Sequence, residues 1–74
     1  MEPSDCKAEL EKLFPDRYSA FTVEYNHHVR IDLDGVTQRY WNTEYHVFGR
    51  LPKRDVIGIG ETLQEAFDKM KATL

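Results

Sequence analysis

Histidine and cysteine are the side chains of this sequence best suited to hold a metal ion or to act as a nucleophile. The chain has three histidines, His27, His28 and His46, and a single cysteine, Cys6. Adjacent side chains of an extended segment point to opposite sides, so His27 and His28 are not expected to share an ion. With one cysteine and no zinc-type ligand spacing, no metal site is predicted. Surface histidines and a core cysteine are the expected roles.

Other catalytic groups are sparse. Ser4 and Ser19 are the only serines, and neither lies in a nucleophile motif. The carboxylates are spread over predicted helix faces and turns, and Asp32 and Asp34 flank a hairpin, where aspartate favours the turn. No acid–base pair in a pocket is expected. We therefore predict that the protein is not an enzyme and takes no cofactor.

Two glycines, Gly58 and Gly60, precede a predicted helix start, a place where glycines can cradle a phosphate. A dinucleotide fingerprint needs a third glycine three residues later in a parallel βαβ unit, and that position is Leu63. A Walker-type Gly-Lys-Ser/Thr sequence is absent. The pair is interpreted as a tight entry into a helix with Thr62 as N-cap and Glu65 reaching back.

The elements that position these residues follow from apolar periodicity. Stripes of period 3.6 predict amphipathic helices over residues 3–14 and 62–74. Period-2 alternation predicts strands over residues 21–25, 29–33 and 36–41, a continuation or restart over 44–51, and a short strand over 55–59. The fold class is α+β in the order α-β-β-β(-β)-α, an antiparallel three- or four-stranded sheet with both helices packed on one face. The predicted core contains Leu10, Leu13, Phe14, Phe21, Val23, Val29, Ile31, Leu33, Val47, Leu63, Phe67 and Met70.

The open face of the predicted sheet is the candidate partner-binding surface. A two-residue turn at Asp34-Gly35 predicts that Arg30 lies opposite Arg39 on this face. A three-residue loop over residues 26–28 pairs Tyr25 with Val29. Like charges directly opposite each other are destabilising, and arginine and tryptophan are enriched at binding hot spots. The candidate partner-binding residues are Arg30, Arg39 and Trp41 on the sheet and Arg50, Lys53 and Arg54 in the GRLPKRD loop. A solvated surface, with Glu24 relieving Arg30, is the open alternative, and the acidic helix faces around Glu9, Glu11, Glu65 and Asp68 are the competing surface.

Length, charge and composition limit the domain number and the cellular location that we expect for the protein. The chain of 74 residues, with net charge −3 and pI about 5.5, is predicted to be one domain, residues 1–74, without a whole-domain basic footprint. No apolar run approaches the roughly 18 residues of a membrane span, and the N-terminus lacks an apolar signal core. A lone cysteine suits a reducing compartment, so a cytoplasmic location is expected. Pairing of an exposed edge strand in a homodimer stays open.

The stretch GIGETLQEAF, residues 58–67, and the element order resemble the double-stranded-RNA-binding domain, which has a similar glycine-rich entry into its final helix. That family grips phosphates with a lysine-rich first turn, and the matching positions here are Thr62, Leu63, Gln64 and Glu65. The resemblance therefore implies the topology, and the phosphate-gripping lysines are missing. A Gly-x-Gly-x-Thr-Leu-x-Glu-Ala ending is also similar to small phage and mobile-element proteins.

Two hypotheses of different classes follow. The first is a non-enzymatic protein-binding module, a phage- or mobile-element-type accessory protein that binds a host protein complex, such as a defence or nucleic-acid-handling complex, and inhibits or modulates it. The alternative is a nucleic-acid-binding domain that uses Arg30, Arg39, Trp41 and the basic loop. Net charge favours the first hypothesis, and a steep salt dependence of nucleic-acid binding would favour the second.

Overall fold

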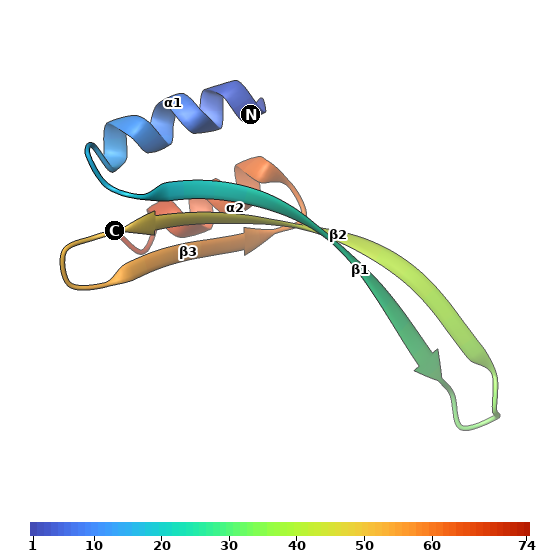
Figure 1. Cartoon of the computed structure of the whole chain (residues 1–74). Helices are drawn as coiled ribbons and strands as arrows, with labels where there is room; N and C mark the ends of the chain where they lie inside the picture. Colours follow the sequence, from blue (N-terminus) through green and yellow to red (C-terminus); the bar gives the residue numbers. More distant parts are fainter.

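A computed structural model describes the protein over all residues 1–74 (Figure 1). The elements in chain order are α1 (Pro3–Leu13), β1 (Ser19–Ile31), β2 (Thr37–Arg50), β3 (Asp55–Gly60) and α2 (Leu63–Lys71). The three strands form one antiparallel sheet in the order β1-β2-β3. The predicted α+β class and element order are confirmed. Three or four strands were predicted, and the sheet has three. Neither α1 nor α2 has the length and the apolar composition of a membrane-spanning helix.

Helix α2 begins at the predicted cap. The Thr62 hydroxyl oxygen accepts a hydrogen bond from the Glu65 backbone N–H at 3.1 Å. The Glu65 carboxylate reaches back as expected, but it accepts from the backbone N–H of Glu61, at 3.3 Å. A hydrogen bond from Lys69, and then the one from Glu61, lower the pKa of Glu65, so the carboxylate stays charged where a negative group suits the helix dipole.

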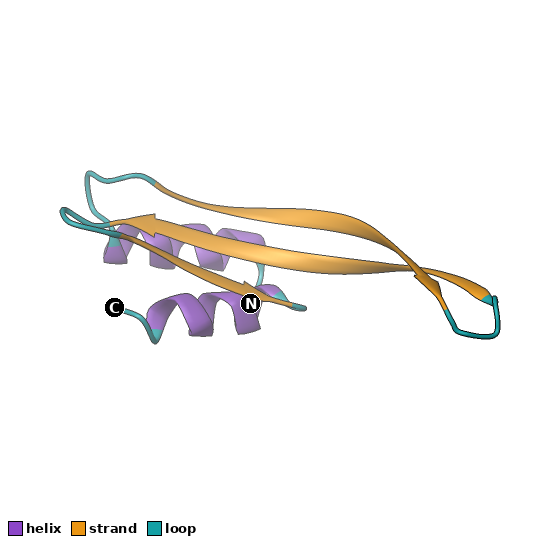
Figure 2. Cartoon of the chain, turned by 90° about the horizontal axis from the view of Figure 1, so that it is seen from below, coloured by secondary structure: helices purple, strands orange, loops and turns teal.

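Both helices cover the same face of the sheet (Figure 2). Side chains alternate along a strand, so residues that share a parity with Val47 on β2 and Val56 on β3 point toward the helices. One cluster of buried side chains joins the helices to these strands. Its members are Cys6, Leu10, Phe14, Val47, Val56, Leu63, Ala66, Phe67 and Met70. Leu13, Phe21, Tyr45 and Leu51 pack partly buried around it.

The glycine pair is explained by the close approach of α2 to β3. A Cβ on Gly58 would lie 2.0 Å from the Ala66 carbonyl oxygen and 2.3 Å from the Met70 backbone nitrogen. A Cβ on Gly60 would lie 2.9 Å from the backbone nitrogen of Ala66. Both glycines belong to β3, and they have negative φ, since Gly35 is the only glycine with positive φ. They therefore serve as a seat for the helix, and the predicted tight entry is a consequence of that contact.

The predicted core extended too far along the sheet. Val23, Val29, Ile31 and Leu33 were expected inside, but they are 39%, 53%, 72% and 111% exposed. For Val29, Ile31 and Leu33 the reason is that β1 and β2 continue well past the two helices as a bare two-stranded ribbon, and Val23 lies at the end of the body where this ribbon begins (Figure 1). The molecule measures 53 × 27 × 17 Å for this reason.

The predicted register was wrong by one residue. The loop over residues 26–28 does not exist, because Asn26 pairs with Asn42 and β1 runs unbroken through it. At the tip, the backbone N–H of Asp32 donates to the Val36 carbonyl, and that of Gly35 donates to the Asp32 carbonyl. Gly35, with φ 83°, closes a three-residue loop rather than a two-residue one. A shift of one residue exchanges the faces on which side chains lie.

Truncation of Phe67 should separate the real core from the predicted one. Phe67 is 4% exposed, so Phe67→Ala should lower the free energy of unfolding by about 3–5 kcal/mol. Ile31 lies on the bare ribbon, so Ile31→Ala should change it by no more than about 0.5 kcal/mol. Urea denaturation of both variants measures this, and an equal loss in the two would contradict the exposed position of Ile31.

The helix seat makes a second prediction. Gly58→Ala should cost at least about 3 kcal/mol, the upper end of overpacking, because the new methyl group meets helix backbone that cannot rotate away. The matched control is Gly35→Ala, where nothing lies within 4 Å and only the left-handed backbone resists, at about 1–2 kcal/mol. Thermal melts should rank the variants in that order; the reverse ranking would mean that α2 is not seated on Gly58.

Candidate functional site

The ribbon that extends past the helices is the most distinctive surface of the molecule. We call residues 25–43 the arm. Strand β3 pairs only with the Tyr45–Arg50 part of β2, so the arm has two strands and two unpaired edges (Figure 1). Isolated two-stranded ribbons are marginally stable in water. Both strands of this one continue into the three-stranded body, which anchors the arm at its base.

The two faces of the arm differ in chemistry. Residues with the parity of Phe21 and Val47 form the face that continues from the helix-covered side. We call Tyr25, Val29, Ile31 and Trp41 on this face the apolar arm face. Tyr25 is 74% exposed, Ile31 72% and Trp41 71%. The opposite face carries mostly polar side chains, namely Asn26, His28, Arg30, Gln38, Tyr40 and Asn42.

Aromatic pairs cross the arm on both faces. The His27 ring stacks on Trp41 with centroids 4.5 Å apart, and the His28 ring stacks on Tyr40 at 4.8 Å. A hydrogen bond of 2.7 Å joins His28 Nε2 to Asn42 Oδ1. Cross-strand aromatic pairs and hydrogen bonds are the interactions that stabilise a ribbon without a covering layer. The histidines predicted to lie in a turn are therefore part of the arm's structure.

The predicted pairing of Arg30 with Arg39 is wrong. Arg30 faces Gln38 and Arg39 faces Val29, because the register differs by one residue. The two arginines lie on opposite faces, and Arg30 donates to Asp32 at 3.0 Å. Arg39 shares its face with Trp41 as predicted, but this is the face that continues from the helix-covered side and not the open face on which both were expected.

The basic loop is remote from Trp41. The loop between β2 and β3 lies at the end of the molecule opposite the arm tip (Figure 1). Arg50 pairs with Asp55 at 3.3 Å and lies over the rings of Tyr18 and Phe48 at 5.6 and 5.9 Å. Arg54 donates to the Thr73 carbonyl at 2.7 Å, and Lys53 borders the same surface hollow as Arg54. The six predicted partner-binding residues thus lie in three places: Arg39 with Trp41 on one face of the arm, Arg30 on the other face, and the remaining three at the β2–β3 loop.

Formal charge is distributed unevenly between the arm and the body. The arm contains Arg30 and Arg39 against Asp32 and Asp34, which sum to zero with neutral histidines. The whole chain has a net charge of −3, so the body carries all of it. The arm therefore combines exposed apolar area with no excess of positive charge.

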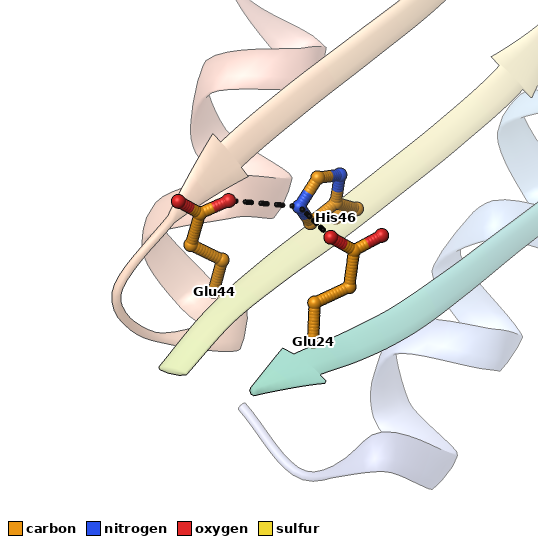
Figure 3. A group of neighbouring side chains, drawn as sticks. All are labelled: Glu24, Glu44 and His46. Carbon is orange, nitrogen blue, oxygen red and sulfur yellow. Dashed lines mark hydrogen bonds and ion pairs between the residues drawn. The ribbon is translucent and has the colours of Figure 1, made fainter. Parts of the chain in front are cut away.

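The face of the body away from the helices holds a second group of functional side chains. Glu24 on β1 lies directly across from Glu44 on β2, and His46 is next to both (Figure 3). The His46 Nε2 atom is 3.1 Å from a Glu44 oxygen and 3.5 Å from a Glu24 oxygen. Sequence reasoning missed this group because Glu24 meets the other two only in the register that the structure shows.

The single thiol lies away from every surface of interest. Cys6 is fully buried between the helices and the sheet, as predicted, and burial raises the pKa of its thiol. A protonated, inaccessible thiol is a poor nucleophile. A hollow of about 300 Å³ lies between α1 and the start of β1, and Cys6 is not among the residues that line it, which are Lys7, Leu10, Glu11, Ser19, Ala20 and Phe21.

Comparison of the chain with protein-family models, with curated proteins and with solved structures gives no significant match. The α-β-β-β-α order is the one that the resemblance to the double-stranded-RNA-binding domain implied. No family is identified by it.

Burial of Cys6 predicts its reactivity. At neutral pH a thiol reagent should label the native protein at least about 100-fold more slowly than the urea-unfolded chain, because reaction requires opening of the core. With a reagent that releases a coloured thiolate when it reacts with a thiol, absorbance measures the labelling rate in both states. Similar rates in the two states would contradict the packing of α1 on the sheet.

Proposed function

We propose that the protein is a non-enzymatic binding module whose arm inserts its apolar face into a groove on a partner protein. The observation that supports this most directly is the exposure of Tyr25, Ile31 and Trp41 along one face of the arm. Contiguous exposed apolar surface on a small domain marks interaction sites. Tryptophan, tyrosine and arginine are also the residues most enriched at binding hot spots, and Arg39 lies within the same face.

The shape of the arm favours a groove over a flat contact. A ribbon two strands wide presents side chains on both faces and unpaired backbone groups at both edges. A partner that surrounds it covers the apolar arm face and supplies hydrogen bonds to the edges in the manner of strand addition. The strands are already paired with each other, so the contact face is ordered before binding and less conformational entropy is lost.

Nucleic acid is the less favoured partner. A β-ribbon can enter a groove of DNA, but affinity for nucleic acid comes mainly from positive charge that neutralises phosphates. The arm has no net charge, and the body is acidic. A protein groove with apolar walls fits the arm better than a phosphate-lined one.

In biological terms, we propose that the module occupies a host protein complex and inhibits or modulates it, as a small accessory protein of a phage or mobile element would. The support for this role is the resemblance of the Gly58–Ala66 stretch to such proteins. Stoichiometric occupation needs only a contact surface, which the arm supplies.

The arm offers a matched pair of double variants as the test. Arg39→Ala/Trp41→Ala removes a guanidinium and an aromatic ring from the apolar side, and Arg30→Ala/Tyr40→Ala removes the same two kinds of group from the opposite face. With a partner isolated on the wild-type protein and then purified, the first variant should weaken binding by about 2 kcal/mol or more. The second should change it by no more than about 0.5 kcal/mol. Isothermal titration calorimetry measures both.

Three results would count against this proposal. Equal binding by the two double variants would remove the apolar arm face from the contact. Loss of binding only in Glu9→Lys/Glu65→Lys would move the contact to the acidic helix faces. Light scattering that shows a dimer of the wild-type protein, dissociated by Arg39→Ala/Trp41→Ala, would make a second copy the occupant. Unfolding of a variant is recognised by circular dichroism before any binding result is interpreted.

A further inference from the structure

The group of Glu24, Glu44 and His46 lies on the open face of the sheet, where the arm leaves the body (Figure 3). Glu24 and Glu44 are direct cross-strand partners, and His46 points its Nε2 atom at a carboxylate oxygen of each. One ligand atom from each residue lies within 4.8 Å of the other two. The His46 side chain is 19% exposed, so the imidazole is held against the sheet while the ligand atoms stay accessible.

The charges of this group are poorly balanced within the chain. Like charges directly opposite each other destabilise a sheet. Neither Glu24 nor Glu44 has a lysine or arginine within ion-pair distance, and His46 is the only basic side chain that reaches them. A neutral imidazole has a single N–H to offer, so two carboxylates compete for it. The arrangement suits a positively charged ligand between the three side chains.

We propose that Glu24, Glu44 and His46 bind one first-row divalent metal ion, with Zn²⁺ as the representative of the class. Bonds from zinc to nitrogen and oxygen of about 2.0–2.2 Å place tetrahedral ligand atoms about 3.3–3.5 Å apart. The two measured separations, 3.1 and 3.5 Å, are close to that edge. Imidazole with carboxylate suits a borderline metal better than Mg²⁺ or Ca²⁺, which prefer oxygen ligands alone. Three protein ligands leave the fourth position to water.

The position of the site gives the ion a mechanical role. Strand β3 pairs with β2 only as far as Tyr45, so Glu44 is the first β2 residue beyond the three-stranded body. An ion held by Glu24 from β1 and by Glu44 and His46 from β2 ties the two strands together at the base of the arm. This inference does not depend on the arm's partner, since metal binding and partner binding are measured separately.

The test titrates Zn²⁺ into chelator-treated protein at pH 7.5, with calorimetry and thermal melting as readouts. Wild-type protein should bind one ion per chain, and zinc at 100 times Kd, which stabilises the folded state by about 2.7 kcal/mol, should raise Tm by about 11–22 °C. Glu24→Gln and His46→Gln should each weaken zinc binding at least about tenfold. Loss of a residue that only hydrogen-bonds to a metal ligand already weakens binding by about 10–100-fold, so loss of a ligand should cost at least the lower value. His28→Gln, which removes a histidine away from the cluster, should bind like wild type, and Mg²⁺ should not compete.

The decisive result is that the difference in Tm between Glu24→Gln and wild type changes sign when zinc is added. This variant keeps the size of the side chain and removes the like-charge pair, so in chelator it should melt at or above the wild-type Tm. In saturating zinc it should melt below wild type. No zinc binding by the wild-type protein would overturn the proposal, as would wild-type affinity in Glu24→Gln. If His46→Gln does not fold, Glu24→Gln decides alone, because relief of repulsion does not threaten the sheet.

Discussion

A mismatch in length between strands and helices determines the rest of this structure. Strand β1 has 13 residues and β2 has 14, which extend for about 45 Å. Helix α1 has 11 residues and α2 has 9, which extend for only about 14–17 Å. Two such helices can cover less than half of the ribbon. The covered part is the core, and the uncovered part is the arm.

The short body is stable because its layers approach closely. The backbone of α2 lies directly on Gly58 and Gly60, and the Phe14 ring fills the space over Gly49. Close approach lets a small number of side chains, Met70 and Val47 among them, be fully buried. A single dense core at one end is what allows the other end to remain without cover.

The body was predictable from the sequence because each of its signals is local. The apolar stripes of the two helices and the Thr62 cap need no knowledge of distant residues. The alternation of Ile57 and Ile59 with Gly58 and Gly60 indicates a short strand just before the last helix. These signals agree with one another, and the structure has the predicted elements in the predicted order.

The arm was not predictable in the same way, for two physical reasons. Asn26-His27-His28 has the composition of a turn, but pairing with β2 overrides that local preference. Asp34-Gly35 fits both a two-residue and a three-residue loop, and the choice exchanges the two faces of the sheet. One signal was available: Phe21, Tyr25 and Val29 keep the same period-2 phase, which a single continuous strand explains. The group of Glu24, Glu44 and His46 depends on the register and has no local signature.

The three-residue loop at the tip of the arm can change in sequence, whereas the residues of the body that fix the strand pairing cannot. The pairing of β1 with β2 is set inside the body, where Phe21 lies opposite Val47 over the core. The tip loop therefore does not set the register of β1 against β2. Leu33 in this loop is fully exposed and contacts little else. Insertions or substitutions at the tip would alter the end of the arm without disturbing the packing of the body. A lineage under pressure to follow a changing target, or an engineer grafting a peptide, can vary this loop while inheriting an intact scaffold.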